Sequence, residues 1–186
     1  MNKTILLKSR PEGTPTLDNF EFVEIDKPTV SEGQVLLKTK YVSVDPYLRG
    51  RMRDEKSYIE PFQLNEPIQS GIIAEVIASQ NPGFKTGDYV NGMLDWKKIQ
   101  THNGKGLQKV DQSKAPLSAY LGILGLTGIT AYVGLLNIGE PKEGDTVLVS
   151  GASGAVGSVV GQIAKIKGCK VVGIAGSDEK ITLLQN

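Results

Sequence analysis

One segment near the end of this 186-residue chain restricts the possible folds more than any other. The run 146–149 is apolar and mostly β-branched, as in a strand buried in a parallel sheet. A glycine-spaced turn, 151–157, follows it, and 170–175 (KVVGIA) is a second strand candidate. Between the turn and this strand, apolar residues recur on one face of a helix: Val156, Val159, Val160 and Ile163. This order predicts a strand–helix–strand unit of about 30 residues.

The glycines of the turn predict that the unit binds a nucleotide. A diphosphate must approach backbone N–H groups at the N-terminus of a helix, where the helix dipole favours an anion. A side chain would block that approach, and a Cβ would block the close crossing of helix and strand. The spacing is GxxGxxG rather than GxGxxG. The alternative is a tight strand-to-helix turn that binds no ligand.

The end of the second strand indicates which nucleotide. An Asp or Glu at this point would bind the ribose 2′-hydroxyl of NAD. This sequence has Gly176 and Ser177 there and then Lys180, which can reach a 2′-phosphate. Asp178 is expected to cap the following helix. The residues therefore favour NADP(H), and the alternative is that Lys180 is an ordinary solvated lysine.

The first two thirds of the chain read as short strands separated by Gly and Pro turns. This pattern favours a sandwich-like or barrel-like β domain. A helix is expected later, at about 128–136, as part of the connection between two domains. The strand candidates are 5–7, 20–25, 34–44, 70–79 and a strand that begins at 88.

Composition excludes several classes of function. Lys plus Arg (21) nearly balances Asp plus Glu (20), so nothing indicates nucleic acid or an anionic membrane as a partner. The single cysteine, Cys169, and single histidine, His102, exclude disulfides and Cys/His zinc clusters within the chain. No apolar run reaches the ~20 residues of a membrane span, and the first residues do not form a signal peptide. A cytoplasmic protein is expected, with His102 in a surface turn and Cys169 as a small buried hydrophobe.

Four motifs resemble those of the medium-chain dehydrogenase/reductase superfamily. They are SVDPYLRGRM (43–52), GFKTGDYVNG (83–92), LGLTGITAYVGL (124–135) and the glycine-turn segment that begins at 150. The chain is most similar to the zinc-independent branch of leukotriene 12-hydroxydehydrogenase/prostaglandin reductases and alkenal double-bond reductases. The resemblance extends over essentially the whole chain.

The resemblance implies an α/β protein with a β-rich domain. A GroES-like substrate domain, 1–126, is followed by the first βαβ unit of a Rossmann fold, 127–186. It also implies which residues bind NADP(H). The diphosphate would lie on Gly154, Ala155, Val156 and Gly157, and the 2′-phosphate on Lys180.

The implied reaction is reduction by NADPH of a carbon–carbon double bond conjugated to a carbonyl group. Hydride would reach the β-carbon, and a hydroxyl rather than a metal would stabilise the enolate. Tyr47 and Tyr58 lie where the family places aromatic residues near its substrate, although either ring could equally pack between strands. No catalytic residue is assigned. Zinc-dependent members carry a ligand cysteine near positions 44–45, and this sequence has none there, so no metal site is expected. The nearby Arg49, Arg51 and Arg53 are expected on a solvated face.

The length of the chain differs from the family pattern. Relatives are roughly twice as long, and a Rossmann half needs three parallel strands where this sequence offers two. The expectation is therefore an N-terminal fragment that is inactive alone and that self-associates, as a dimer, or binds a complementing segment through its exposed strand edge. Two alternatives stay open: an NADPH quinone reductase of the same superfamily, and a non-catalytic NADP-binding module.

Overall fold

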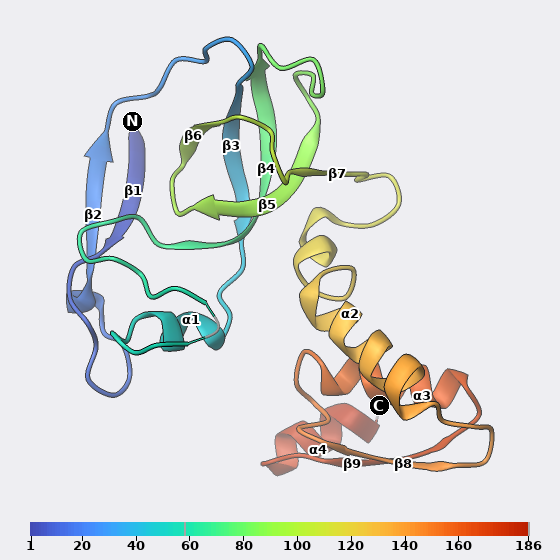
Figure 1. Ribbon diagram of the computed structural model, residues 1–186. Helices are drawn as coiled ribbons and strands as arrows, with labels where there is room; N and C mark the ends of the chain where they lie inside the picture. The colour runs from blue at the N-terminus through green and yellow to red at the C-terminus, as the bar shows by residue number, and fades with distance from the viewer. Residues whose placement is uncertain (58, 186) are drawn as a thin grey trace. The chain divides into compact units, whose positions relative to one another are not determined.

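The computed structural model describes residues 1–57 and 59–185 (Figure 1). Its backbone divides into two compact units, Met1–Ser118 and a second from Ala119 onward. The predicted boundary at 126/127 separates a substrate-binding part from a cofactor-binding part. The two compact units are defined by backbone geometry alone, so that functional boundary stays a prediction. The expected order, a β-rich part followed by a strand–helix–strand part, is confirmed.

The first unit is built from two antiparallel sheets. A two-stranded sheet pairs β1 (Asn2–Leu7) with β2 (Phe20–Ile25), and Leu17–Asn19 forms a 3-10 turn, η1, between them. A five-stranded sheet has the order β6-β3-β4-β5-β7. Its strands are β3 (Val35–Val42), β4 (Gln69–Ser79), β5 (Tyr89–Asp95), β6 (Ile99–His102) and β7 (Gln108–Val110). Every predicted strand is present, whereas β6 and β7 were not predicted.

Alternation of apolar and polar residues along these strands produces the main core of the first unit. Residues two apart on a strand share a face, so the apolar members of β3, β4 and β5 meet on one side of the sheet. Trp96 packs against this cluster, and its indole Nε1 donates a 2.8 Å hydrogen bond to Oγ of the fully buried Ser70. The cluster comprises Val35, Leu37, Ile72, Ala74, Val76, Val90 and Leu94.

The short helix α1 (Tyr47–Arg51) packs in a second apolar cluster of the first unit. It carries two of the three arginines that were expected on a solvated face, Arg49 and Arg51, and neither is there. Arg51 is buried; its guanidinium lies 4.0 Å from the Phe62 ring centroid, and its Nε donates to the Glu60 carbonyl at 2.9 Å. Burial lowers the pKa of Arg51, an effect that nearby Tyr47 opposes. The solvated-face expectation is thus wrong for Arg51, because a planar cation can stack on an aromatic ring when its N–H groups are satisfied.

Arg49, on the same helix, anchors a remote loop. Its Nη2 donates to the Pro11 carbonyl and its Nε to the Gly13 carbonyl, both at 2.9 Å. The expectation of a solvated face is wrong for Arg49 as well. It holds only for Arg53, whose side chain is 57% exposed and lies 3.9 Å from the Glu55 carboxylate.

The second unit contains the predicted strand–helix–strand arrangement. β8 (Thr146–Ser150) and β9 (Lys170–Ile174) pair in parallel, joined through α3 (Gly157–Ile166), and α4 (Asp178–Gln185) follows. The inner face of the strand pair packs with α3 on a small apolar core that includes Cys169. The buried, free thiol agrees with the expected packing role of this residue.

An apolar helical segment precedes β8. It starts with a 3-10 turn, η2 (Leu117–Leu121), and continues as α2 (Leu126–Tyr132) and a wider π-helical stretch, η3 (Val133–Gly139). The predicted helix at 128–136 is therefore present but longer at both ends. Glycine is required at position 128, since a Cβ there would collide with the Ile123 carbonyl. In the part of the chain that the structure describes, no helix is both long and apolar enough to cross a membrane.

His102 is not in a surface turn, contrary to expectation. It is the last residue of β6 and is partly buried, and its Nδ1 accepts a 3.0 Å hydrogen bond from the Gly104 N–H. Burial lowers the pKa of this imidazole, and Asp95 partly opposes the effect. The expectation was wrong because the Asn103-Gly104 turn begins only after His102, and His102 itself is still part of the strand.

An ion pair closes the turn before β5. The Asp88 Oδ2 lies 2.8 Å from Lys109 Nζ on β7 and accepts a 3.0 Å hydrogen bond from the Lys85 N–H. These two bonds, the first of them chiefly, hold the pKa of Asp88 below its ordinary value of 3.8. A lowered folded-state pKa means that the stabilisation is complete above the unfolded-state pKa and is lost as pH falls through the folded-state pKa.

Replacing Asp88 with Asn should lower the free energy of unfolding by about 1 kcal/mol at neutral pH, because a charge-assisted bond is lost. The difference between wild type and variant should be smaller at about pH 2.5, because that pH lies below the ordinary value of 3.8 that the carboxyl has when unfolded, and the stabilisation is then partly lost. Urea unfolding of both proteins at the two pH values measures this, with Glu12→Gln as a control at an exposed position. An equal difference at both pH values would contradict the assignment.

Candidate cofactor-binding site

The glycine turn between β8 and α3 has a defined backbone conformation. Gly151 adopts φ +59°, a left-handed value that favours glycine, and its carbonyl accepts a 2.8 Å hydrogen bond from the Gly154 N–H. The Ala152 N–H donates to the Ile174 carbonyl at 3.0 Å. The turn is therefore fastened to the carboxyl end of β9, the edge of a parallel sheet where ligands bind in open α/β folds.

Gly157, the first residue of α3, cannot carry a side chain in this conformation. A Cβ would collide with the Gly151 carbonyl oxygen and would lie 3.0 Å from the Ala152 Cα. The absence of this carbon lets the helix start directly against the end of β8. That close approach brings the first turn of the helix, with its N–H groups, to the edge of the sheet.

The N-terminus of α3 presents unpaired hydrogen-bond donors. The first helical hydrogen bond joins the Ser158 N–H to the Gly154 carbonyl at 2.9 Å. Within residues 1–57 and 59–185, the N–H groups of Ala155, Val156 and Gly157 have no acceptor. Such donors and the helix dipole together attract an anion. The four residues predicted to line a diphosphate thus lie in one short turn with donors that an anion could bind.

The loop after β9 carries the residue predicted to bind a 2′-phosphate. Lys180 lies in the first turn of α4 and is exposed. Ser177 caps this helix: its Oγ accepts a 3.4 Å hydrogen bond from the Lys180 N–H, and its carbonyl accepts one from Ile181. The prediction that Asp178 is the cap is wrong by one residue, because Asp178 is already the first helical residue. Residues 175–177 carry no carboxylate.

A cavity of about 610 Å³ adjoins the turn, and the sequence did not predict it. It is lined by Ala152 and Ser153 of the turn, by Gly157 and other α3 residues, and by Leu184 of α4. Of the predicted cofactor residues, Gly157 alone contributes to its wall.

Of the two predicted substrate residues, Tyr47 lies in the described part of the first unit. Tyr47 begins α1 and packs, partly buried, against the cluster of Leu7, Leu48, Met52, Phe62 and Ile68. The packing role left open for Tyr47 is therefore present. Tyr58 lies outside the described residues.

No acidic, histidine or cysteine cluster suited to a metal ion occurs among residues 1–57 and 59–185.

Comparison with known proteins identifies the first unit. Residues 3–110 match a family described as the N-terminal domain of oxidoreductase. The matched segment runs from β1 to β7 and thus includes α1 and both sheets of the first unit.

Similarity over the whole chain extends to curated oxidoreductases and reductases. A Bacillus subtilis protein, YfmJ, whose name provisionally assigns it as an NADP-dependent oxidoreductase, is 59% identical over 97% of this chain and 53% of its own length. The NADP(+)-dependent 2-alkenal reductase of Nicotiana tabacum is 45% identical over 100% of this chain and 55% of its own. The chain therefore spans about half the length of the curated relatives it matches.

A solved structure confirms the fold. The crystal structure of CurA from Vibrio vulnificus in complex with NADPH has a TM-score of 0.92 and 44% identity, covering 99% of this chain and 55% of that one. Together these matches show that the chain belongs to the oxidoreductase family defined by this N-terminal domain, within the medium-chain dehydrogenase/reductase superfamily.

Proposed function

We propose that the natural polypeptide carrying residues 1–186 is an NADPH-dependent reductase of the carbon–carbon double bond of α,β-unsaturated carbonyl compounds. The observation that carries the proposal is the set of unpaired N–H donors at the start of α3, behind a turn that only glycine can form. The names of the tobacco 2-alkenal reductase and of the NADPH complex of CurA support the choice of substrate class and cofactor.

The residues present fit the cofactor. The donors of Ala155, Val156 and Gly157 would bind the diphosphate oxygens, and Gly154 leaves room for the approach, with its own N–H bonded to Gly151. The exposed ammonium of Lys180, next to a loop without a carboxylate, would bind the 2′-phosphate. When bound, NADPH supplies the hydride that reduces the double bond.

The substrate would be held by phenol groups of the first unit. A tyrosine hydroxyl can donate a hydrogen bond to the substrate carbonyl and stabilise the negative charge that develops on its oxygen. For Tyr47, packing against Leu48 and Phe62 would fix the ring in place. Tyr58 is proposed for the same role on the family pattern alone, and no residue is assigned as proton donor.

The remaining features of the proposal concern the protein as a whole. Residues 1–126 would hold the substrate and residues from 127 onward the cofactor, in a cytoplasmic, zinc-independent enzyme. A homo-oligomer, as a dimer, is supported by the outer face of β8–β9, where the paired Leu148 and Val172 are 65% and 41% exposed. The mass of a single chain by light scattering would contradict the oligomer.

Replacing Gly157 with Ala should weaken NADPH binding by about tenfold or more, because the new Cβ displaces the Gly151 carbonyl and the turn. Gly161→Ala is the matched control on the same helix: its Cβ would lie at an ordinary 3.7 Å from Val171 Cγ1. A fluorescence titration measures both affinities, with circular dichroism to verify folding. If folded G157A binds NADPH as well as wild type, the turn is not the site.

Replacing Lys180 with Ala should weaken NADPH binding by about tenfold and leave NADH binding unchanged, because only NADPH carries the 2′-phosphate. Lys167→Ala is the control. Lys167 lies at the C-terminal end of α3, whereas the glycine turn lies at its N-terminal end, so this variant should change the affinity for neither cofactor. Calorimetric titration gives the six affinities, of wild type and both variants for each cofactor. Equal weakening of both cofactors in K180A would show a general loss of charge and not recognition of the phosphate.

Turnover tests the proposed reaction itself. The natural polypeptide should oxidise NADPH with a 2-alkenal and form the saturated aldehyde, whereas the saturated aldehyde alone should be inert. Faster oxidation with a simple quinone than with any enal would favour the quinone reductase alternative. NADPH binding with no turnover of either substrate would favour a non-catalytic module.

A further inference from the structure

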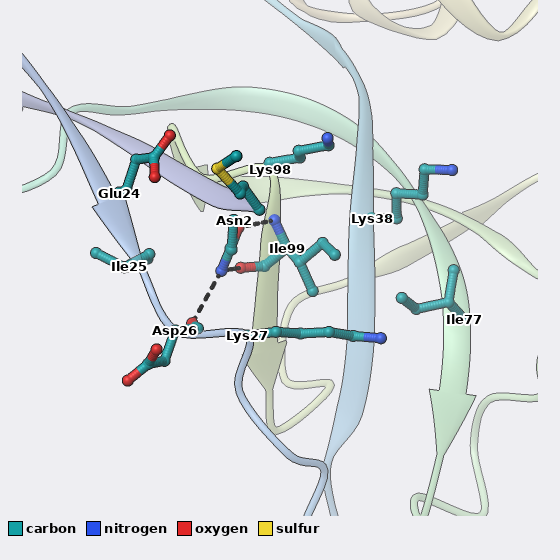
Figure 2. A pocket seen from close by; sticks show the side chains of 10 residues that line it. Asn2, Glu24, Ile25, Asp26, Lys27, Lys38, Ile77, Lys98 and Ile99 are labelled. Atoms are coloured by element: carbon teal, nitrogen blue, oxygen red, sulfur yellow. Dashed lines mark hydrogen bonds between the residues drawn. The ribbon is translucent and has the colours of Figure 1, made fainter.

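A cavity in the first unit is remote in sequence from the cofactor turn and has no assigned role. It measures about 950 Å³ and lies where the end of β2, the start of β1 and the β3–β6 edge meet (Figure 2). A volume of this size suits a small organic ligand. Apolar side chains from three different strands line it: Ile25, Ile77 and Ile99.

A β-bulge supplies one of these apolar side chains. In the β3–β4 ladder Leu36 pairs with Ala78 and Leu37 with Val76, so Ile77 is the extra residue. A bulge turns a side chain out of the strict alternation of a strand. Val76 is fully buried in the core, as the alternation of Ile72, Ala74 and Val76 requires, while its neighbour Ile77 is only partly buried and lines the cavity.

Asn2 holds the wall of the cavity in a fixed geometry. It is 3% exposed; its Nδ2 donates to the Ile99 carbonyl at 2.9 Å and to the Asp26 carbonyl at 3.2 Å. Its Oδ1 accepts hydrogen bonds from the N–H groups of Lys3 and Ile99. One buried side chain thus links three strand ends, so the cavity is formed without a ligand (Figure 2).

The charges around the cavity are divided by side. Glu24 and Asp26 lie toward β2, whereas Lys27, Lys38 and Lys98 extend away from it (Figure 2). Glu24 is paired with Lys3 at 3.7 Å. By contrast, none of the three lysines has a carboxylate partner in the stretches 1–57 and 59–185.

The lack of a carboxylate partner at Lys38 does not extend along its strand. On the same strand, the ammonium of Lys40 lies 3.5 Å from the Glu75 carboxylate. Lys38 lies opposite Ile99 in the β3–β6 ladder and opposite Glu75 in the β3–β4 ladder, but the Glu75 carboxylate forms its ion pair with Lys40 and none with Lys38. Uncompensated lysines beside an apolar wall are complementary to a molecule that has one anionic group and one aliphatic part.

We propose that this cavity binds a small aliphatic carboxylate, with its carboxylate among Lys27, Lys38 and Lys98 and its chain on Ile25, Ile77 and Ile99. The cavity shares no lining residue with the cofactor turn, and the proposal does not depend on the proposed reductase function. The probe that tests it is octanoate, added to the ¹⁵N-labelled 186-residue chain at low salt.

Octanoate should produce saturable amide shifts centred on Asn2, Ile77 and Ile99. Octan-1-ol lacks the charge and acetate lacks the chain, so each should bind about tenfold or more weakly than octanoate. Octylammonium, with the opposite charge, should bind no better than octanol. Equal affinity for octanoate and octanol, or shifts that map elsewhere, would overturn the proposal.

The double variant Lys38→Glu/Lys98→Glu should weaken octanoate binding by about tenfold, since both exposed side chains reverse their charge. The matched control, Lys105→Glu/Lys114→Glu, makes the same change of net charge at positions that do not line the cavity and should stay within about twofold of wild type. The resonances of the Asn2 side-chain amide report whether each variant keeps its fold. A folded K38E/K98E protein with wild-type affinity would overturn the proposal.

Discussion

The candidate cofactor site depends on one steric constraint: the carbonyl of Gly151 and the Cα of Gly157 approach so closely that no Cβ fits between them. This contact starts α3 directly at the end of β8, and the Ala152 N–H then fastens the turn to the end of β9. The donors of the first helical turn consequently face the edge of the sheet without partners. Geometry, hydrogen bonding and helix dipole all favour an anion at the same place.

The sequence predicted this half of the molecule well because its signals are local. A β-branched run, a glycine turn and a helix-period pattern each fix one element, and their order fixes a parallel pair. The cap of α4 was misplaced by one residue, from Ser177 to Asp178, because both residue types cap helices equally well. Which of the two residues caps α4 depends on where the chain leaves β9, and the residue types alone do not determine that position. The donors of Ala155, Val156 and Gly157 follow from the same local order.

Features that depend on contacts between distant segments could not be predicted in this way. The short strands β6 and β7 carry little apolar alternation and exist because β3 and β5 offer them partners. The burial of Arg51 depends on Phe62 across a loop, against the general preference of arginine for solvent. The lysine-lined cavity combines residues from the start, the first third and the middle of the chain. One of them, Ile77, is a bulge residue, and no sequence pattern predicts the bulge. Long-range pairing therefore limits what the sequence alone reveals.

The central claim is that the unpaired N–H groups of the turn bind the diphosphate of NADPH. It is tested most directly by following the backbone amides of Ala155, Val156 and Gly157 by NMR, with hydrogen exchange, as NADPH is added. The account predicts that these amides show the largest shifts in the chain and exchange more slowly when NADPH is bound, because each then donates to a phosphate oxygen. Saturable NADPH binding that leaves these three amides unchanged would contradict the account.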